Sequence, residues 1–495
     1  MKFSSLLATT ALMAAGCSLV QAQNPFVRGN FSADPTARVF GDRVYVYPSH
    51  DITPTTAPEA RQDWFCMADY HVYSSDDLVN WTDHGVIVDQ KDVPWGNPKA
   101  YSMWAPDCVQ GPDGCYYFYF PNAPKPVEGQ RGGGFGVGVA ISENPYGPFV
   151  CEPHQIEGLS GIDPCVMQTS SGEAYIFWGG GGLRAAKMKP NLLELSEDNP
   201  VDVRKFGDRE FKTIGVDVSK DLPKAGLMEG PFAFERNGKY YLTYPWVRYK
   251  AGETNDKGEV LDNPTEALVY AMSDNPMGPY EYKGLIMEES PTHCWTNHHS
   301  IVEFKGQWYL FYHHNDYSPN FDKSRSVRVD SLTFNPDGTI RQVIPTLRGV
   351  GITDAAGKVQ IDRYSAVSDK GTELRFTYEE NIPADTTLRF EGWKILMDQK
   401  SWVRYEKAEV KQRAASKAIM RVRATKGAEF KLELQPVMHS AALPKVSAPL
   451  KVEETDGWRV ISLDIPVVAP GVYDITLTNT GKTDGVEVDW ISLGK

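Results

Sequence analysis

"GLMEGPFAFERNGKYYLTYPW" (residues 226–246) reads as a β-hairpin whose entrance carries a carboxylate among apolar side chains. Aromatic residues recur on both sides of Asn237-Gly238, a dipeptide typical of a tight turn between two strands. Glu229 precedes the first strand and stands between Met228 and Gly230-Pro231-Phe232. Burying an unpaired carboxylate costs several kcal/mol. We therefore interpret Glu229 as a functional residue that the fold holds in an apolar setting.

The plan of this hairpin recurs four more times in the first two-thirds of the chain. Each copy opens with an acidic residue or a histidine, runs through a short apolar stretch to a turn with glycine, and ends in an aromatic-rich strand. The copies begin about 55 to 75 residues apart, which is the length of a four-stranded sheet with its connections. Such sheets repeated around an axis form a β-propeller, so the sequence predicts an all-β, five-bladed propeller over residues 23–345. The residues that open the five copies are Asp34, Asp107, Asp163, Glu229 and His299.

The innermost strand of every propeller blade runs along the central channel, so the opening residues are expected to meet at one end of it. An aspartate before proline is often only a turn cap. Asp34, Asp163 and Glu229 occupy matching points of a repeat, however, and caps would not need a common register. We therefore predict that these three form one site. Asp107 is interpreted as structural.

Two carboxyl groups in one pocket are what glycoside hydrolysis requires, one to protonate the leaving oxygen and one to activate water or attack the sugar. Glu229 has the most apolar neighbours, so burial is expected to raise its pKa and make it the general acid. Asp34, which lies between Ser32 and Thr36 and near Arg38, is expected to stay ionised as the general base. Asp163 is expected beside Glu229, where its charge raises the pKa of the acid further.

Several other residues are candidates for contact with a sugar. Arg325 is interpreted as a hydroxyl clamp or, alternatively, as a paired strand residue. His298 or His299 is expected to hold a water molecule or a metal ion, and calcium is favoured over zinc because no cluster has zinc-ligand spacing. The aromatic candidates for stacking on sugar are Trp104, Phe65, Phe232 and Trp295, each with a core position as the alternative.

Short alternating strands replace the aromatic repeat in the last third of the chain. Phe430, Leu432 and Leu434 alternate with charged residues, as in a half-buried strand. The sequence predicts a connector that returns across the propeller over residues 342–371. A β-sandwich of the jelly-roll type is expected to follow. The second region, which contains both, is predicted over residues 346–495.

The first 22 residues read as a signal peptide, with Lys2, an alanine-rich apolar run and the small-x-small sequence Val20-Gln21-Ala22. We expect an exported protein, periplasmic or secreted. Ala15-Gly16-Cys17 permits a second interpretation, in which Cys17 carries a lipid anchor. No later stretch is long and apolar enough to span a membrane.

The amino-acid composition limits the classes of molecule that the protein is expected to bind. A net charge of -13 argues against nucleic acid and anionic membranes, whereas 12 Trp and 24 Tyr suit a protein that stacks on sugars. The six cysteines after Cys17 are irregularly spaced, and we interpret them as small buried residues rather than as disulfides. The oligomeric state stays open.

Asp34-Pro35, Gly161-Ile162-Asp163-Pro164 and Glu229-Gly230-Pro231 with the aromatic strand that follows resemble the signature of the family 43 glycoside hydrolases, over about residues 25–345. This resemblance implies inverting five-bladed propellers that act on arabinofuranosides and β-xylosides and need no cofactor for the chemistry. It implies Asp34 as base, Asp163 as pKa modulator and Glu229 as acid. Inversion implies a separation of about 6.5–9.5 Å between base and acid.

The same resemblance implies that a histidine of the fifth inner strand lies near a bound calcium ion or water, matching His298 or His299. The ending "GVYDITLTNTGKTDGVEVDWISLGK" (residues 471–495) resembles a family 6 carbohydrate-binding module more weakly. Glu487 stands where that family has a sugar-binding asparagine, so the region either binds sugar in another way or only supports the propeller.

Four functions are compatible with parts of this pattern. The favoured one is an exported exo-glycosidase that removes terminal xylose or arabinofuranose, or both, from plant cell-wall polysaccharides or oligosaccharides, with inserts at residues 51–70 and 121–135 closing the funnel into a pocket. An open groove would instead indicate an endo-arabinanase or another glycosidase of this fold. A retaining fructosidase shares the architecture but needs a Trp-Met-Asn-Asp-Pro type of sequence where Phe31-Ser32-Ala33-Asp34-Pro35 stands. A non-catalytic carbohydrate-binding protein would not need three carboxylates.

Overall fold

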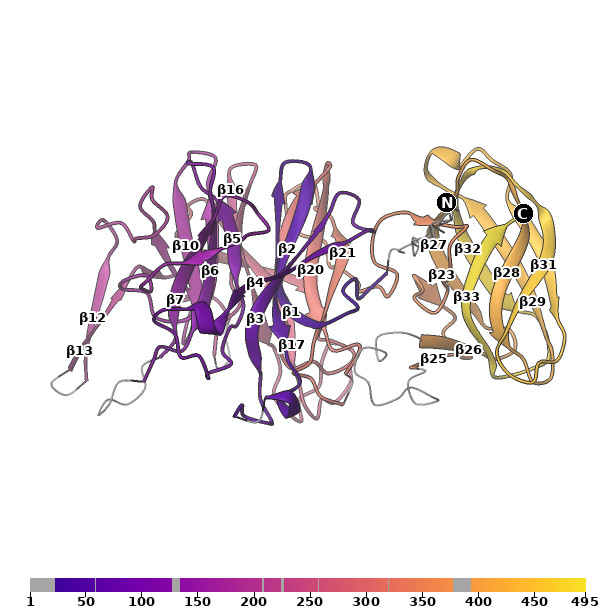
Figure 1. Cartoon of the computed structure of the whole chain (residues 1–495), viewed down its shortest axis with the longest axis horizontal. Helices are drawn as coiled ribbons and strands as arrows, with labels where there is room; N and C mark the ends of the chain where they lie inside the picture. The colour runs from indigo at the N-terminus through magenta and orange to yellow at the C-terminus, as the bar shows by residue number, and fades with distance from the viewer. Residues whose placement is uncertain are drawn as a thin grey trace, which may run out of the picture.

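The computed structural model describes residues 23–57, 59–126, 134–206, 209–223, 227–256, 258–318, 320–376 and 393–495. The expected signal peptide and the expected lipid-anchor site Cys17 lie outside the described residues. The chain forms two β-rich bodies, one from β1–β21 and one from β22–β33 (Figure 1). The prediction of an all-β chain is confirmed.

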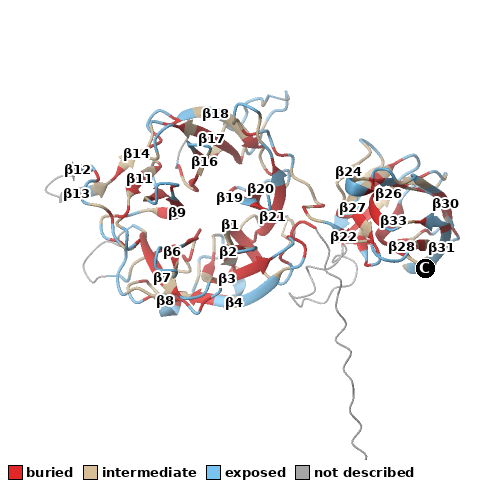
Figure 2. Ribbon diagram, turned by 90° about the horizontal axis from the view of Figure 1, so that it is seen from above, coloured by how far each residue is buried: buried red, intermediate tan, exposed pale blue. Residues whose placement is uncertain are grey.

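The first body contains five sheets arranged in a ring (Figure 2). The first sheet is β1 (Phe31–Phe40), β2 (Arg43–Asp51), β3 (Met67–Ser75) and β4 (Thr82–Asp89). The second is β5 (Asp107–Gln110), β6 (Tyr116–Asn122), β7 (Gly136–Ser142) and β8 (Val150–Cys151). The third is β9 (Ile162–Gln168), β10 (Ala174–Gly179), β11 (Arg184–Lys187) and β14 (Val216–Asp217), with β12 (Val201–Phe206) and β13 (Arg209–Ile214) as a separate hairpin. The fourth is β15 (Phe232–Arg236), β16 (Lys239–Val247), β17 (Glu266–Ser273) and β18 (Glu281–Met287), and the fifth is β19 (His299–Phe304), β20 (Gln307–His314) and β21 (Ser326–Leu332).

The inner strands close the ring. Taken in order, β1, β5, β9, β15 and β19 each contact the next, and β19 contacts β1. The start of β1 and the segment before it also run along β21 and the residue that precedes it, because the Ser32 N–H donates to the Arg325 carbonyl at 2.9 Å and the Phe26 N–H to the Val327 carbonyl at 3.3 Å. The beginning of the chain therefore completes the edge of the fifth sheet, and the prediction of a five-bladed propeller is confirmed.

Both faces of each propeller sheet are buried against neighbouring sheets. In β2, Val44 and Val46 pack in the cluster shared with the fifth sheet, whereas Tyr45 and Tyr47 pack in the cluster shared with the second. Successive residues of a strand point to opposite faces, so this run of apolar and aromatic residues fills two interfaces at once. The six described cysteines are unpaired; Cys66, Cys108, Cys165 and Cys294 are buried, as interpreted, whereas Cys115 and Cys151 are only partly buried.

The second body is a sandwich of two sheets around one apolar core. One sheet contains β22 (Thr353–Asp354), β24 (Ala366–Val367), β27 (Trp402–Val410), β32 (Gly471–Asn479), β29 (Ala428–Pro436) and β30 (Val446–Val452). The other contains β23 (Val359–Gln360), β25 (Thr372–Phe376), β26 (Trp393–Met397), β33 (Val486–Gly494), β28 (Ala415–Arg423) and β31 (Arg459–Val468). Phe430, Leu432 and Leu434 point into the core as their alternation predicts.

The predicted connector is only partly correct. The Val343 N–H donates to the Ile286 carbonyl at 2.7 Å, so the chain does return across the fourth blade. From Thr353 onward, however, residues 353–367 form β22, β23 and β24 of the sandwich. These strands are two residues long, too short to show the alternation from which a strand is read in a sequence.

Helical structure in the described part of the chain is limited to three short 3-10 turns, η1 (Pro54–Thr56), η2 (Gln90–Asp92) and η4 (Met438–Ser440). None of the helices in these residues is long and apolar enough to cross a lipid bilayer.

Candidate active site

Asp34 and Asp163 stand at bulges in the inner strands β1 and β9. Their φ angles are 50° and 57°, in the left-handed region, and each precedes a proline. The pairing register of β1 with β2 shifts between Ala33 and Thr36, and β9 shows a similar shift around Asp163. Bulges of this kind re-aim a side chain next to active sites, and the strained backbone persists because the surrounding sheet holds it.

The matching position of the fourth blade is held by Gly230 and not by Glu229. Gly230 has a φ of 56° and precedes Pro231, as Asp34 and Asp163 precede their prolines. Glu229 thus stands one residue ahead of the register expected from the sequence. It still lies beside the same group of residues, because the next N–H along the chain, that of Gly230, donates to Asp163 Oδ2 at 2.9 Å.

Asp34 is held as an ionised carboxylate. One carboxylate oxygen accepts a hydrogen bond from Arg325 Nη1 at 2.7 Å, and the other accepts from the Ser49 hydroxyl. The Asp34 N–H donates to Nδ1 of His313 at 3.0 Å, which fixes the backbone as well. Burial, the largest single influence, would raise the pKa of Asp34, but the charge of Arg325, the neighbouring histidines and the Ser49 hydrogen bond together outweigh it and lower this pKa to about 2.

Arg325 is fully occupied by protein partners. Nε and Nη2 each donate to one oxygen of Asp51, both at 2.9 Å. Nη1 donates to Asp34 and, at 3.3 Å, to Thr296 Oγ1. The second N–H of Nη2 contacts the Met67 sulfur at 3.6 Å. A guanidinium has five N–H donors, and all five are used. The expected hydroxyl clamp is therefore wrong, and Arg325 is a paired residue that positions Asp34.

Glu229 and Asp163 are neighbouring carboxyl groups whose pKa values are both raised. The Gly230 N–H donates to Asp163 Oδ2 at 2.9 Å, so the two acidic residues are adjacent as expected. Burial, together with the charge of Asp34, raises the pKa of Glu229 to about 7. Burial and the charge of Glu229 raise the pKa of Asp163 well above its usual range. Like charges this close cannot all ionise at neutral pH, so the group keeps a proton.

A fourth carboxyl, Glu266, joins this group and was missed in the sequence. It is buried at the start of β17 and accepts a hydrogen bond from the Asn297 N–H at 2.9 Å. Burial and the charge of Glu229 raise its pKa. Glu266 lies in a third strand, outside the repeat of opening residues, so nothing in the local pattern marks it.

Gly179 supports Glu229 from behind. A Cβ at Gly179 would lie 2.6 Å from the Cα of Glu229 and 2.9 Å from the carbonyl oxygen of Met228. The Gly180 N–H donates to that same carbonyl at 3.1 Å. The end of β10 and the segment that carries Glu229 are therefore in direct backbone contact.

Substitution of Gly179 by alanine is expected to push Glu229 out of position and to lower kcat by about a hundredfold, the cost of a misplacement near one ångström. Steady-state hydrolysis of a 4-nitrophenyl glycoside measures this. Gly29→Ala is the matched control, since a Cβ there meets nothing within 4 Å. Equal activity of the two variants would show that this backbone contact does not position the acid.

An aromatic cluster made by Trp64, Phe65, Trp104 and Trp295 lies beside the site. Phe65 stacks on Trp295 with ring centroids 6.1 Å apart and contacts Trp104 at the same distance. Arg325 lies 4.9 Å from the ring centre of Phe65, which places the cluster next to the base. Trp295 is 38 % exposed and so offers a face to a sugar. Trp64 was not among the residues predicted to contact sugar. It immediately precedes Phe65 in the insert that was expected to close the pocket, and this position next to a predicted sugar-binding residue could have identified it.

Phe232 is not a sugar platform, and its prediction as one is wrong. It is 2 % exposed and packs in the core between the third and fourth blades, with the Arg38 guanidinium 5.0 Å from its ring centre. A strand residue at this point faces the neighbouring blade, whereas Trp295 lies in a loop. Asp107 is structural, as interpreted: it pairs with Arg38 and accepts the Val166 N–H at 2.6 Å.

The two histidines of the fifth blade are buried and neutral. Burial lowers the pKa of His298 to about 4, and that of His299 well below its usual range. Nε2 of His299 is hydrogen-bonded to Thr243 and its ring is fully buried, so the expected sugar contact of His299 is wrong. Its Nδ1 is buried without a protein partner. Among the described residues, no group of three ligand side chains gathers at either histidine, so the donors do not make the oxygen-rich shell that calcium prefers.

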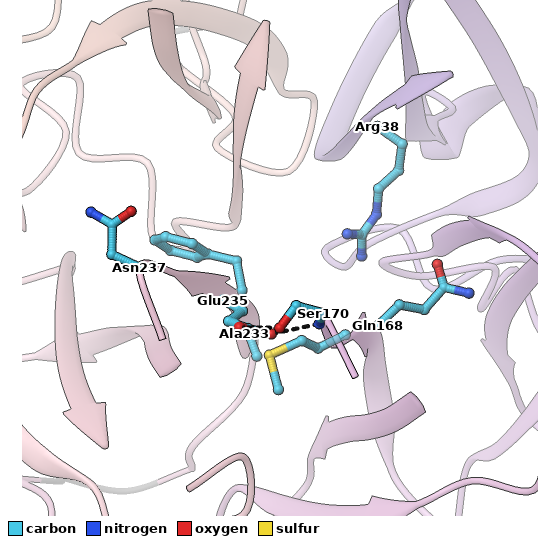
Figure 3. A pocket seen from close by; sticks show the side chains of 8 residues that line it. Arg38, Gln168, Ser170, Ala233, Glu235 and Asn237 are labelled. Carbon is cyan, nitrogen blue, oxygen red and sulfur yellow. Dashed lines mark hydrogen bonds between the residues drawn. The ribbon is translucent and has the colours of Figure 1, made fainter. Parts of the chain in front are cut away.

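A pocket separate from the three carboxylates lies at the other end of the inner strands. It measures about 410 Å³ and is lined by residues that include Arg38, Gln168, Ser170 and Glu235 (Figure 3). The Ser170 N–H donates to Glu235 at 2.7 Å across it. Asp34, Asp163 and Glu229 do not line this pocket, so it is separate from the candidate active site.

Comparison with known proteins agrees with this geometry. The sequence is 36% identical over 340 residues to a protein named xylosidase/arabinosidase from Bacteroides ovatus, covering 63% of this chain and 95% of that protein. A crystal structure of a β-xylosidase/α-arabinofuranosidase from a compost microbial metagenome, with xylotriose and in a calcium-free form, matches 66% of this chain and 98% of its own with a TM-score of 0.50 and 34% identity. An arabinoxylan arabinofuranohydrolase from Bacillus subtilis matches 97% of this chain with a TM-score of 0.52 and 21% identity, so both bodies share its fold. The family described as Glycosyl hydrolases family 43 matches residues 22–340, and the chain therefore belongs to this family of glycoside hydrolases.

Proposed function

We propose that the protein is an inverting exo-glycosidase that removes terminal xylose, arabinofuranose or both. The observation that carries the proposal is the opposite ionisation of two carboxyls in one site, with the pKa of Asp34 near 2 and that of Glu229 near 7. Glu229 donates its proton to the glycosidic oxygen as the bond to the sugar breaks. Asp34 accepts a proton from the water molecule that attacks the opposite face of the sugar.

The substrate class rests on the relatives and on the aromatic cluster. The similar proteins are named for xylosidase and arabinosidase activity, and one structure holds xylotriose. Xylopyranose and arabinofuranose present similar hydroxyl positions, so one pocket can accept either. Trp64, Phe65 and Trp295 gather on one side of the site and would cover a terminal sugar, which favours exo action on plant oligosaccharides or polysaccharides. Family members need no cofactor for this chemistry.

Three finer points belong to the proposal. The signal sequence supports export, with Cys17 as the site of a lipid anchor if cleavage occurs before it. The orphan Nδ1 of His299 suits a channel water better than a structural calcium ion. Glu487 is paired with Lys394 at 2.9 Å and with Arg423, so the sandwich is proposed to support the propeller rather than to bind sugar at that position.

The test is hydrolysis of 4-nitrophenyl β-D-xylopyranoside and 4-nitrophenyl α-L-arabinofuranoside, followed by proton NMR of the first anomer released from xylotriose. Release from either glycoside with inversion at the anomeric carbon is expected. Inactivity on both glycosides together with cleavage inside arabinan would replace the proposal by an endo-arabinanase. Retention of configuration would refute the assigned roles of Asp34 and Glu229.

A further inference from the structure

A cluster of three metal-ligating side chains lies on the first blade, apart from the carboxylates of the active site. Ligand atoms of His50, Asp69 and His71 all lie within 4.8 Å of one another. His50 Nδ1 is 2.7 Å and His71 Nε2 is 3.9 Å from the same oxygen, Asp69 Oδ1. The three side chains are between 13% and 22% exposed, so an ion in solution can reach them.

The pairing of β2 with β3 brings these residues together. In this antiparallel pair Ser49 lies opposite Tyr70. Asp69 and His71 are two residues apart in β3 and therefore point to the same face of the sheet. His50 follows Ser49 on β2 and reaches them from the neighbouring strand.

A fourth residue orients His71 from behind. His71 Nδ1 lies 3.1 Å from Asp83 Oδ1, and Asp83 belongs to the next strand, β4. An ionised carboxylate can only accept a hydrogen bond, so Nδ1 of His71 carries the proton. In the neutral ring Nε2 then aims a lone pair toward Asp69, an arrangement that a cation between them stabilises. A carboxylate behind a histidine is the usual second partner of a metal-bound imidazole.

We propose that His50, Asp69 and His71 bind one divalent transition-metal ion of the zinc class, with water completing the coordination. Two imidazoles and one carboxylate are a donor set that zinc and its first-row neighbours prefer over calcium or magnesium. Ligands at about 2.0–2.2 Å from a tetrahedral ion lie roughly 3.3–3.5 Å apart, between the two distances that Asp69 makes here. When the ion takes the place of the hydrogen bond between His50 and Asp69, the neutral His50 ring binds through Nδ1 and carries its proton on Nε2.

The site lies directly behind the general base. Ser49 and Asp51, the neighbours of His50 on β2, point to the opposite face, where Ser49 donates to Asp34 and Asp51 pairs with Arg325. A bound ion ties β2 to β3 at this point. It is expected to raise the melting temperature of the protein, because a ligand that binds only the folded state stabilises it.

Calorimetric titration of the tag-free, chelator-treated chain with zinc chloride at neutral pH tests the proposal. One ion per chain is expected. His71→Ala should weaken binding by roughly tenfold or more, and Asp83→Asn by up to about 10- to 100-fold, because the amide lacks the negative charge that raises the basicity of the His71 ring. His154→Ala is the matched control, since His154 is exposed and lies far along the chain. Both His71 and Asp83 variants should retain the hydrolytic rate of the wild type without metal.

Two further measurements, of the melting temperature and of competition by calcium, decide between the outcomes. The rise in melting temperature with zinc should be lost in His71→Ala and kept in His154→Ala. Excess calcium chloride should not displace zinc. Absence of zinc binding, equal affinity in wild type and His71→Ala, or full competition by calcium would each overturn the proposal. If His71→Ala does not fold, the Asp83→Asn titration alone decides.

Discussion

Replacing Glu229 by glutamine is expected to lower kcat for oligosaccharide hydrolysis about a thousandfold, because the amide cannot protonate the leaving oxygen. The loss should be smaller for a 4-nitrophenyl glycoside, whose leaving group needs little help from an acid. The wild-type rate should fall as pH rises through about 7, since the protonated form of Glu229 disappears there. In the variant this alkaline limb should be absent. Rates on xylobiose and on 4-nitrophenyl xyloside across pH measure both effects.

Glu235→Gln is the matched control for this prediction. Glu235 lies in β15, the inner strand that follows Glu229, at the far end, where it bonds to Ser170. The same chemical change there should leave the rate and its pH profile unaltered. Equal losses on both substrates, with the alkaline limb intact, would show that another group protonates the leaving oxygen, and Glu266 would then be the first candidate.

Replacing Asp34 by asparagine is expected to reduce kcat about a thousandfold or more on every substrate, because activation of water does not depend on the leaving group. Asparagine keeps the shape and still accepts from Arg325, and Arg325 remains paired with Asp51. The melting temperature should therefore change little. The wild type should lose activity on the acid side only as pH approaches about 2, where Asp34 gains a proton.

Asp42→Asn provides the comparison for Asp34, as Asp42 is exposed in the same blade. Measurement of kcat on xylobiose and 4-nitrophenyl xyloside for each variant separates base from acid: the Asp34 loss should be the same on both substrates, and the Glu229 loss should not. An Asp34 variant that retained more than a tenth of the wild-type rate would remove Asp34 from the role of base.

The blades and the three carboxylates were predictable because their signals are local. Alternating aromatic strands, glycine turns and Asp-Pro pairs each span only a few residues. The pairing of Arg325 with Asp34 and Asp51 could not be predicted, because these partners lie 291 and 274 residues away in the chain. Phe232 shows the same limit, because a strand aromatic next to a functional residue looks alike in sequence whether it faces sugar or core.

The pair of Asp34 and Arg325 also bears on how the chain folds. Asp34 belongs to the first blade and Arg325 to the loop that enters the last strand of the fifth, so the bond that ionises the base forms only when the ring has closed. Contacts over such sequence distances carry a large loop-closure cost and slow the folding of β-rich chains. A chain lacking its fifth blade would hold Asp34 without its counter-charge, and its pKa would then follow burial and rise. Catalytic competence thus arrives in a single step at the end of folding, rather than blade by blade.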